Sequence, residues 1–346
     1  MLGSKRAHSA RATLGDVREL GLLSVVAPLH DEEDTVGAFH ARTVAALEGI
    51  DFELVLVDDG SRDGTGARLR ELAAADERIK VIALSRNFGH QAALSAGLEH
   101  ALGEVVVMID GDLQDPPELI VEMVAAWRRG ADVVYAVRES REGETRFKIL
   151  TARWFYRVFA RLARIELAHD SGDFRLMDRA PLDALLSMPE RNRFLRGMTV
   201  WVGFTQTAVA YQRAARAGGE TKFTPAKMLR FAFDAITSFS HAPLQAATLL
   251  GFTFSILAFL AIPLTVVARY TDVYTRGVPS TIVIILLLGG IQLITVGIIG
   301  EYVGRIYDEV KHRPLYVVRD RVNVEAPDAS ERTGTQPASS ASSGAT

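Results

Sequence analysis

The chain has 346 residues and a net charge of −3, which is enough sequence for one large domain with an appendage and offers no charge excess suited to nucleic acid. It contains no cysteine, which excludes disulfides and cysteine metal sites and fits a reducing compartment. Hydrophobic residues make up 48%, an ordinary share for a soluble domain, yet the mean hydropathy is +0.13, so the apolar excess must be local.

Residues 1–20 contain no apolar segment, so we expect a flexible N-terminus without a cleavable signal peptide. From residue 21 onward, short apolar segments of β character alternate with segments of helical period. The expected strands are Leu22–Ala27, Phe52–Val57, Lys80–Leu84, Val105–Ile109 and Val133–Val137, and the helices between them include Thr35–Leu47 and Gly64–Ala75. This alternation predicts an α/β domain over residues 21–223, with a mostly parallel sheet flanked by helices on both faces.

Polar residues follow three of these strands, at Pro28–Glu32, Asp58–Ser61 and Asp110–Asp115. The carboxyl ends of parallel strands meet at one edge of the sheet, where ligands of such sheets bind. Carboxylates gathered there repel one another unless a ligand or a cation uses them. Asp110-Gly111-Asp112 suits Mg²⁺ or Mn²⁺ shared with a diphosphate, whereas Asp115, before two prolines, also fits a helix cap.

Two uncharged segments, about residues 243–268 and 278–300, are each long enough to cross a bilayer, which takes about 20 residues. The short loop between them predicts an antiparallel hairpin within residues 242–304. Basic residues precede and follow the hairpin, so we expect both termini and the α/β domain in the cytoplasm and the chain as a multi-pass protein of the inner or plasma membrane. Residues 224–241 are expected to form an interfacial amphipathic helix, and residues 305–346 a cytoplasmic tail that is disordered after about 326.

Several motifs together resemble the family 2 glycosyltransferases of the GT-A fold, in the branch of dolichol-phosphate mannose synthase and the bacterial polyprenyl-phosphate glycosyltransferases. The resemblance covers about residues 22–318. The matching segments are residues 57–65 (Val-Asp-Asp-Gly-Ser-Arg-Asp-Gly-Thr), 86–91 (Arg-Asn-Phe-Gly-His-Gln), 110–118 (Asp-Gly-Asp-Leu-Gln-Asp-Pro-Pro-Glu), 172–179, 191–197 and 219–223.

The resemblance implies a binding site for a nucleotide-sugar and for Mg²⁺ or Mn²⁺. The donor residues are then Pro28, His30, Glu32, Asp58, Asp59, Ser61, Asp110, Gly111, Asp112, Arg175, Arg196 and Lys222, and the metal ligands are Asp110, Asp112 and Gln114. Two positions depart from the family pattern. His30-Asp31 replaces the usual Tyr-Asn, and Gly111 stands where alanine is common, which we expect to be harmless.

The resemblance also implies inverting transfer of a hexose to polyprenyl phosphate, such as undecaprenyl or decaprenyl phosphate. A phosphate monoester has a second pKa of about 6, so it is already a nucleophile at neutral pH and needs no general base. It does need cations to hold it, for which Arg138 and Lys148 are our candidates. With Asp110, Asp112 and Asp173 they complete the expected catalytic set.

The resemblance is nearer to the bacterial branch, which implies a UDP-sugar in preference to GDP-mannose as donor, and homo-oligomerisation is left open. A processive polysaccharide synthase is disfavoured because its Gln-x-x-Arg-Trp motif is absent, and a nucleotidyltransferase because no glycine-rich basic loop follows the first strand. Dinucleotide and P-loop sites lack their glycine motifs. A catalytically inactive membrane partner and a transferase for another lipid acceptor remain as alternatives. His90, without metal-ligand spacing, is expected to be an ordinary polar or core residue.

Overall fold

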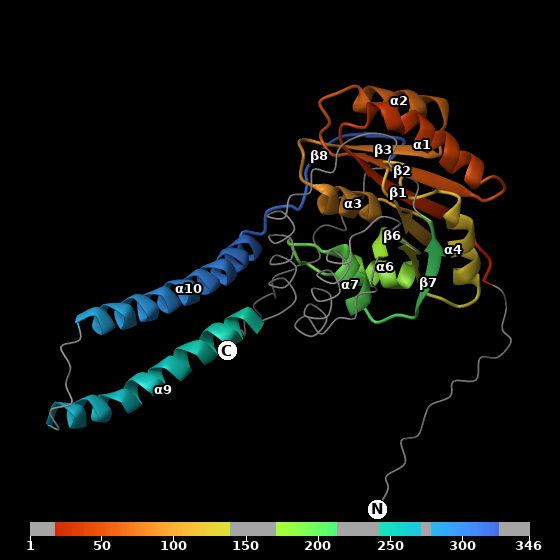
Figure 1. Cartoon of the computed structure of the whole chain (residues 1–346). Helices are drawn as coiled ribbons and strands as arrows, with labels where there is room; N and C mark the ends of the chain where they lie inside the picture. The colour runs from red at the N-terminus through yellow and green to blue at the C-terminus, as the bar shows by residue number, and fades with distance from the viewer. Residues whose placement is uncertain (1–17, 139–170, 213–241, 271–277, 325–346) are drawn as a thin grey trace, which may run out of the picture.

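A computed structural model describes residues 18–138, 171–212, 242–270 and 278–324. Eight strands form one sheet in the order β7-β5-β6-β4-β1-β2-β3-β8, drawn in Figure 1. The strands are β1 (Leu23–Leu29), β2 (Phe52–Asp58), β3 (Ile79–Leu84), β4 (Val105–Met108), β5 (Val133–Arg138), β6 (Ser171–Asp178), β7 (Gln206–Tyr211) and β8 (Val318–Val322). The helices of this domain are α1 (Glu33–Ala46), α2 (Thr65–Ala75), α3 (His90–Glu99), α4 (Leu119–Arg128), α6 (Arg179–Leu186) and α7 (Leu195–Trp201).

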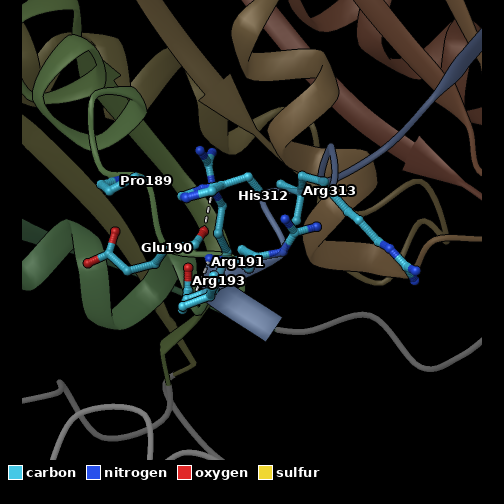
Figure 2. A pocket seen from close by; sticks show the side chains of 9 residues that line it. Pro189, Glu190, Arg191, Arg193, His312 and Arg313 are labelled. Atoms are coloured by element: carbon cyan, nitrogen blue, oxygen red, sulfur yellow. Dashed lines mark hydrogen bonds between the residues drawn. The ribbon is translucent and has the colours of Figure 1, made fainter. Parts of the chain in front are cut away.

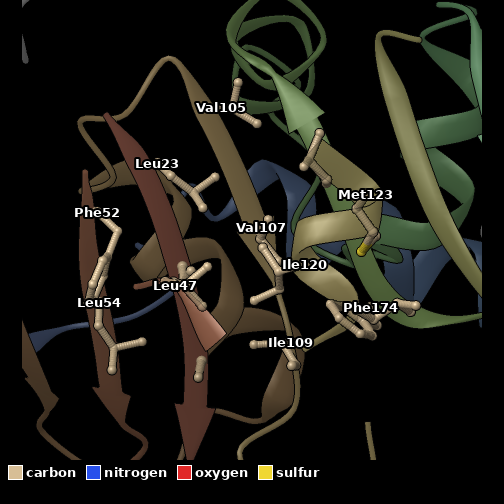
Figure 3. Packing of buried hydrophobic residues seen from close by; sticks show 14 of the residues in the cluster. Leu23, Leu47, Phe52, Leu54, Val105, Val107, Ile109, Ile120, Met123 and Phe174 are labelled. Atoms are coloured by element: carbon tan, nitrogen blue, oxygen red, sulfur yellow. The ribbon is translucent and has the colours of Figure 1, made fainter. Parts of the chain in front are cut away.

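The central strands are apolar throughout because both faces of the sheet are covered. Successive side chains of a strand point to opposite faces, so Val25 and Ala27 belong to one core cluster while Val26 belongs to the other. Helices α1, α2 and α4 cover the first face, and α3, α6 and α7 cover the second. Figure 3 shows the first cluster, where Ile120 and Met123 of α4 pack near Val107 of β4. The predicted α/β class, with a mostly parallel sheet and flanking helices, is confirmed.

Strand β6 is the main addition to the predicted sheet. It lies antiparallel between β4 and β5, and β7 adds a parallel strand outside β5. The β4–β6 register sets Arg175 opposite Met108, at the carboxyl end of β4. The segment preceding Arg175 therefore lies beside the carboxylates that follow β4, although more than 50 residues separate them in sequence.

The last described strand lies within the predicted cytoplasmic tail, residues 305–346. There Val318–Val322 form β8, which pairs antiparallel with β3. The Ser85 N–H donates to the Val317 carbonyl at 2.9 Å, and the Asn323 side-chain amide donates to the carbonyls of Ala73 and Ile79. The segment after the second apolar helix is therefore part of the α/β domain, because it covers an otherwise open edge of the sheet.

Two long apolar helices extend from the α/β domain, as Figure 1 shows. They are α9 (Ala242–Tyr270) and α10 (Val278–Val310), and they contact each other. Within them, Pro243–Ala261 and Leu287–Val310 are long and apolar enough to cross a membrane, and almost none of either stretch is buried. A soluble core helix would be mostly buried, so these exposed helices indicate membrane association. The second helix is longer than predicted, since it continues past Gly300 to Val310.

Candidate active site

The carboxylates that follow β4 lie where the sequence predicts them, at the carboxyl end of the sheet. Gly111, between Asp110 and Asp112, packs against β1 so closely that a Cβ there would lie 2.4 Å from Leu29 Cδ2. The glycine therefore lets Leu29 fill the space beneath the turn. Asp112 Oδ1 accepts a hydrogen bond from the Gln114 backbone N–H at 3.1 Å, which holds the turn in shape. The Gln114 side chain itself is mostly buried.

His90 is a site residue that the sequence interpretation missed. Its Nε2 lies 3.3 Å from Asp173 Oδ2 on β6 and 3.5 Å from Asp110 Oδ1. Gln91 Nε2 donates to the same Asp173 oxygen at 3.2 Å. Because β6 was not predicted, only the family resemblance placed Asp173 in one site with Asp110. For His90 the available signal was the Arg-Asn-Phe-Gly-His-Gln segment, which belongs to the resemblance and ends in His90 and Gln91.

The ionisation of these three groups is coupled through their contacts. Burial raises the pKa of Asp110 to about 6, and although His90 opposes this, Asp173, Asp115 and Asp112 raise it further. Burial lowers the pKa of His90, but the hydrogen bond to Asp173 and the nearby carboxylates outweigh it, so the net direction is upward. For Asp173, burial favours the neutral acid, yet His90 and the two arginines Arg196 and Arg175 hold its pKa below the usual range.

Asp59 organises the loop that carries His90. Both of its carboxylate oxygens accept backbone N–H groups, from Phe88 at 2.7 Å and Gly89 at 2.9 Å, and the residue is only 3% exposed. Gly60 makes this approach feasible, because a Cβ there would lie 2.4 Å from the backbone of Arg86. The predicted donor residue Asp59 thus fixes the start of α3, which sets the position of His90.

The remaining predicted donor residues surround the ends of β1 and β2. Pro28 lies within β1, and Ser61 Oγ accepts the Asp31 N–H at 3.1 Å. The Glu32 N–H donates to Thr65 Oγ1 at 2.9 Å, which joins the first loop to the start of α2. His30 is more than a third exposed, with Nε2 3.6 Å from Asp31 Oδ2.

Asp58, the last residue of β2, lies beneath the loop that contains Ser61. It is buried, and its Oδ1 accepts the Ser61 N–H at 2.8 Å. The guanidinium of Arg319 on β8 lies 3.9 Å from the other oxygen. Strand β8 therefore approaches the region predicted for the donor.

Arg175 and Arg196 lie together beside Asp173 but differ in exposure. Arg196 pairs with Asp173 Oδ1 at 3.3 Å and keeps part of its side chain accessible. Arg175 is 2% exposed and donates to the carbonyls of Gly172 and Arg196, so its contacts are with backbone. Burial lowers the pKa of Arg175 to about 10. Its guanidinium ties β6 to the start of α7.

Arg138, the last residue of β5, belongs to a second group of polar side chains, next to the group formed by His90, Asp110 and Asp173. Its Nε donates to the Tyr211 hydroxyl at 3.2 Å, and that hydroxyl donates to Asp115. Burial and the hydrogen bond with Asp115 raise the pKa of Tyr211 to about 12. Helix α4 begins after Glu118, so Asp115 serves this cluster and does not cap the helix. Lys148 and Lys222, with the predicted interfacial helix, lie outside the described residues.

The chemistry at the end of β4 fits a hard divalent cation. Asp110 Oδ1 is buried and accepts no hydrogen bond from a described residue. No group of three or more His, Asp or Glu side chains in the described ranges is arranged to hold a metal on its own. Mg²⁺ sites at phosphates typically use only one or two carboxylates and take their other ligands from substrate and water. Asp110 and Asp112 form such a pair.

Comparisons with known proteins identify the family of the chain. A family model for glycosyl transferase family 2 matches residues 24–186. The chain is 47% identical over 305 residues to the uncharacterized glycosyltransferase YkcC of Bacillus subtilis (strain 168), covering 87% of this chain and 94% of that protein. It is 40% identical over 303 residues to the bactoprenol glucosyl transferase of Shigella phage SfV, covering 86% of this chain and 98% of that protein. The resemblance is confirmed: the chain belongs to glycosyl transferase family 2.

Proposed function

We propose that the protein transfers a hexose from a nucleotide-sugar, a UDP-sugar in preference to GDP-mannose, to polyprenyl phosphate at the membrane. The proposal rests on two features that occur in the same molecule, a polar site at a strand end and a pair of apolar helices. Asp110 and Asp112 follow β4, where His90 lies close to both Asp110 and Asp173, and two exposed apolar helices extend from the same domain. Relatives that are 40% identical over most of the chain are named bactoprenol glucosyl transferases, which supports a polyprenyl acceptor.

On the donor side, Asp110 and Asp112 would hold Mg²⁺ or Mn²⁺ together with the diphosphate. Such a cation offsets the negative charge that develops on the leaving diphosphate. His90 lies between the carboxylates of Asp110 and Asp173, so in its protonated form it adds positive charge at the same place. Asp173 is held ionised by Arg196 and suits a sugar hydroxyl as a hydrogen-bond acceptor.

On the acceptor side, the polyprenyl phosphate oxygen attacks the anomeric carbon. The bond between that carbon and the donor phosphate oxygen breaks, and the nucleoside diphosphate leaves with the electron pair. The proposed attack comes from the side opposite the leaving group, which inverts the anomeric configuration. The phosphate dianion predominates above pH about 6, so no side chain has to remove a proton. Arg138, with its neighbour Tyr211, would hold the phosphate, and Lys148 and Lys222 are proposed to assist.

The fold also supports a cytoplasmic orientation of both ends of the hairpin. Strand β8 follows α10 and pairs with β3, which precedes α9, so the two ends of the hairpin lie on the same side of a membrane that it spans. Arg305, Lys311 and Arg313 at the end of α10 favour the cytoplasmic side. We therefore propose a multi-pass protein whose active site faces the cytoplasm.

The test uses membranes that contain the full chain, undecaprenyl phosphate and a panel of radiolabelled sugar nucleotides. We expect label in the organic phase with one donor, loss of the product after chelation of divalent cations, and recovery when Mg²⁺ or Mn²⁺ is restored. Matched membranes that contain Asp112→Ala control for endogenous enzymes. Equal product from the variant and the wild type would contradict the assignment of the site.

A further inference from the structure

A basic pocket lies where the second apolar helix meets the α/β domain. Its volume is about 440 Å³, and it is formed by the loop between α6 and α7 on one side and by the end of α10 with the following turn on the other. Figure 2 shows Pro189, Glu190, Arg191 and Arg193 on the loop facing His312 and Arg313 on the turn. The Arg191 backbone N–H donates to Glu309 Oε1 at 3.0 Å and joins the two walls.

The arginines of the pocket differ in whether a carboxylate pairs with them. Three arginines and one histidine line the pocket, together with Glu190 and Glu309. Arg193 is turned into the wall, where it donates to the carbonyls of Met188 and Glu190 and lies 3.8 Å from the carboxylate of Glu99. In the part of the chain that the structure describes, the guanidinium groups of Arg191 and Arg313 have no ion-pair partner. They are therefore available to an anion.

The position of the pocket relies on the proposed membrane insertion of α10. The candidate membrane span Leu287–Val310 is uncharged up to Gly300, and its charged end, Glu301–Val310, leads to the pocket, where Val310 on the rim is 66% exposed. One turn earlier Tyr307 carries Lys311 over its ring at 3.8 Å, a pairing suited to the membrane–water interface. His312 is held at φ 46°, an unfavourable backbone conformation for a residue with a side chain. The turn at the membrane surface is thus shaped to present His312 and Arg313 to the pocket.

We propose that this pocket binds the phosphate headgroup of an anionic membrane lipid. Guanidinium groups bind phosphate oxygens with charge-assisted hydrogen bonds, and basic pockets at the cytoplasmic ends of membrane helices suit such headgroups. Pro189, Val310 and Leu315 give the same pocket an apolar wall against which a glycerol backbone can lie. The pocket volume lies within the range of small-molecule sites.

The site also connects to the catalytic residues. Leu195 follows the pocket loop, and its N–H donates to Gln91 Oε1 at 2.9 Å, while the amide of Gln91 donates to Asp173. A headgroup that steadies the loop would therefore steady the start of α7 and, through Gln91, the carboxylate beside His90. The same lipid would fix the α/β domain against the membrane surface at one angle.

The test is a native mass spectrometry titration of the purified full chain in uncharged detergent. The ligands are phosphatidylglycerol, phosphatidylcholine of the same acyl chains, and glycerol phosphate free in solution. We expect one saturable phosphatidylglycerol site that the other two ligands do not fill. Arg191→Gln with Arg313→Gln should bind phosphatidylglycerol at least about tenfold more weakly, because each lost charge-assisted contact corresponds to roughly that factor or more. Arg191→Lys with Arg313→Lys, which keeps the charge, should retain binding.

The matched control removes two arginines on the opposite side of the domain, Arg128→Gln with Arg129→Gln on the exposed end of α4, and should bind like the wild type. Donor affinity that is unchanged in every variant verifies the fold. Equal binding of the two lipids, equal binding of glycerol phosphate, or an unaffected Arg191/Arg313 glutamine variant would each overturn the proposal. Displacement of phosphatidylglycerol by polyprenyl phosphate, with a raised acceptor KM in that variant, would overturn it in favour of an acceptor site. Failure of sugar transfer alone would leave the lipid result intact and count only against the proposed reaction.

Discussion

Removal of β8 is expected to destabilise the α/β domain although it leaves every carboxylate of the proposed active site in place. The perturbation is a chain that ends after Tyr316, compared with a control chain that ends after Val324 and keeps β8. The shorter chain loses the pairing of Val318–Val322 with β3 and exposes that edge of the sheet. A domain cut off before the apolar helices suffers the same loss.

The size of the effect follows from contacts that the cut removes. Outside the strand ladder it removes the hydrogen bond from Ser85 to Val317 and two from the Asn323 amide. Each contributes about 1 kcal/mol net, so together they contribute about 3 kcal/mol before the ladder and the partly buried valines Val318, Val322 and Val324 are considered. For a domain of about 200 residues, this corresponds to a fall in Tm of roughly 6–12 °C.

The assay is tryptophan fluorescence melting of both chains in the same detergent at one scan rate, which reports on the buried Trp127 of α4. We expect the shorter chain to melt lower by at least 6 °C and to aggregate on heating, because the uncovered strand β3 can pair with other molecules. If the two chains melt within about 2 °C of each other, β8 does not stabilise the domain and our reasoning is refuted.

Four further results are expected. Asp112→Ala should abolish transfer, because it removes one oxygen ligand worth several kcal/mol of transition-state stabilisation, and it should leave the melting curve unchanged. Near-normal turnover of the variant would exclude Asp112 from the site. Arg138→Gln should lower kcat/KM for lipid phosphate about ten- to a hundredfold with donor affinity kept, and an equal loss of donor affinity, measured by calorimetry, would assign it to the nucleotide. Gly111→Ala should cost about 1–3 kcal/mol of stability through its clash with Leu29, and Leu29→Val should relieve part of that cost in a double-mutant cycle; additive effects would argue against the clash. The pKa of Asp110 is raised to about 6 in the folded protein, against about 4 in the unfolded chain. Its carboxyl group therefore stabilises the fold below a pH of about 4, and this contribution is lost as the pH rises through about 6. In the presence of a chelator, Asp110→Asn should accordingly raise the Tm at pH 8 and leave it unchanged at pH 4.

The sequence predicts the strands that are nearly continuous apolar segments and misses β6, β7 and β8, which contain polar or charged residues. The apolar segments of β1 to β5 are readily identified as strands, because strands covered by helices on both faces are apolar on both faces. Strand β6 contains Asp173 and Arg175, and burial of an arginine within a strand goes against the usual apolar pattern. Strand β8 alternates charged and apolar residues as an edge strand does, so by sequence it resembled the polar tail around it.

The same difference between apolar and polar strands explains which site residues the sequence places correctly and which it does not. Asp110, Asp112 and Asp59 follow recognised strands, so their position at one edge of the sheet followed from the α/β topology. The contact of His90 with Asp173 depends on β6 and on the loop held by Asp59, and only the segments of the family resemblance, residues 86–91 and 172–179, pointed to these parts of the chain. The role of Asp59 also needed coordinates, because only they show its two oxygens accepting backbone N–H groups.

The measurement that tests the central claim most directly is the stoichiometry of the reaction by the purified full chain in lipid nanodiscs. With the active donor, Mg²⁺ or Mn²⁺ and polyprenyl phosphate, we predict one lipid-linked sugar formed for each nucleoside diphosphate released. Neither product should appear when Asp112→Ala replaces the wild type, and release should nearly stop when the lipid phosphate is omitted. Release of nucleoside diphosphate at the same rate without lipid phosphate, or no lipid-linked sugar with any donor, would contradict the account.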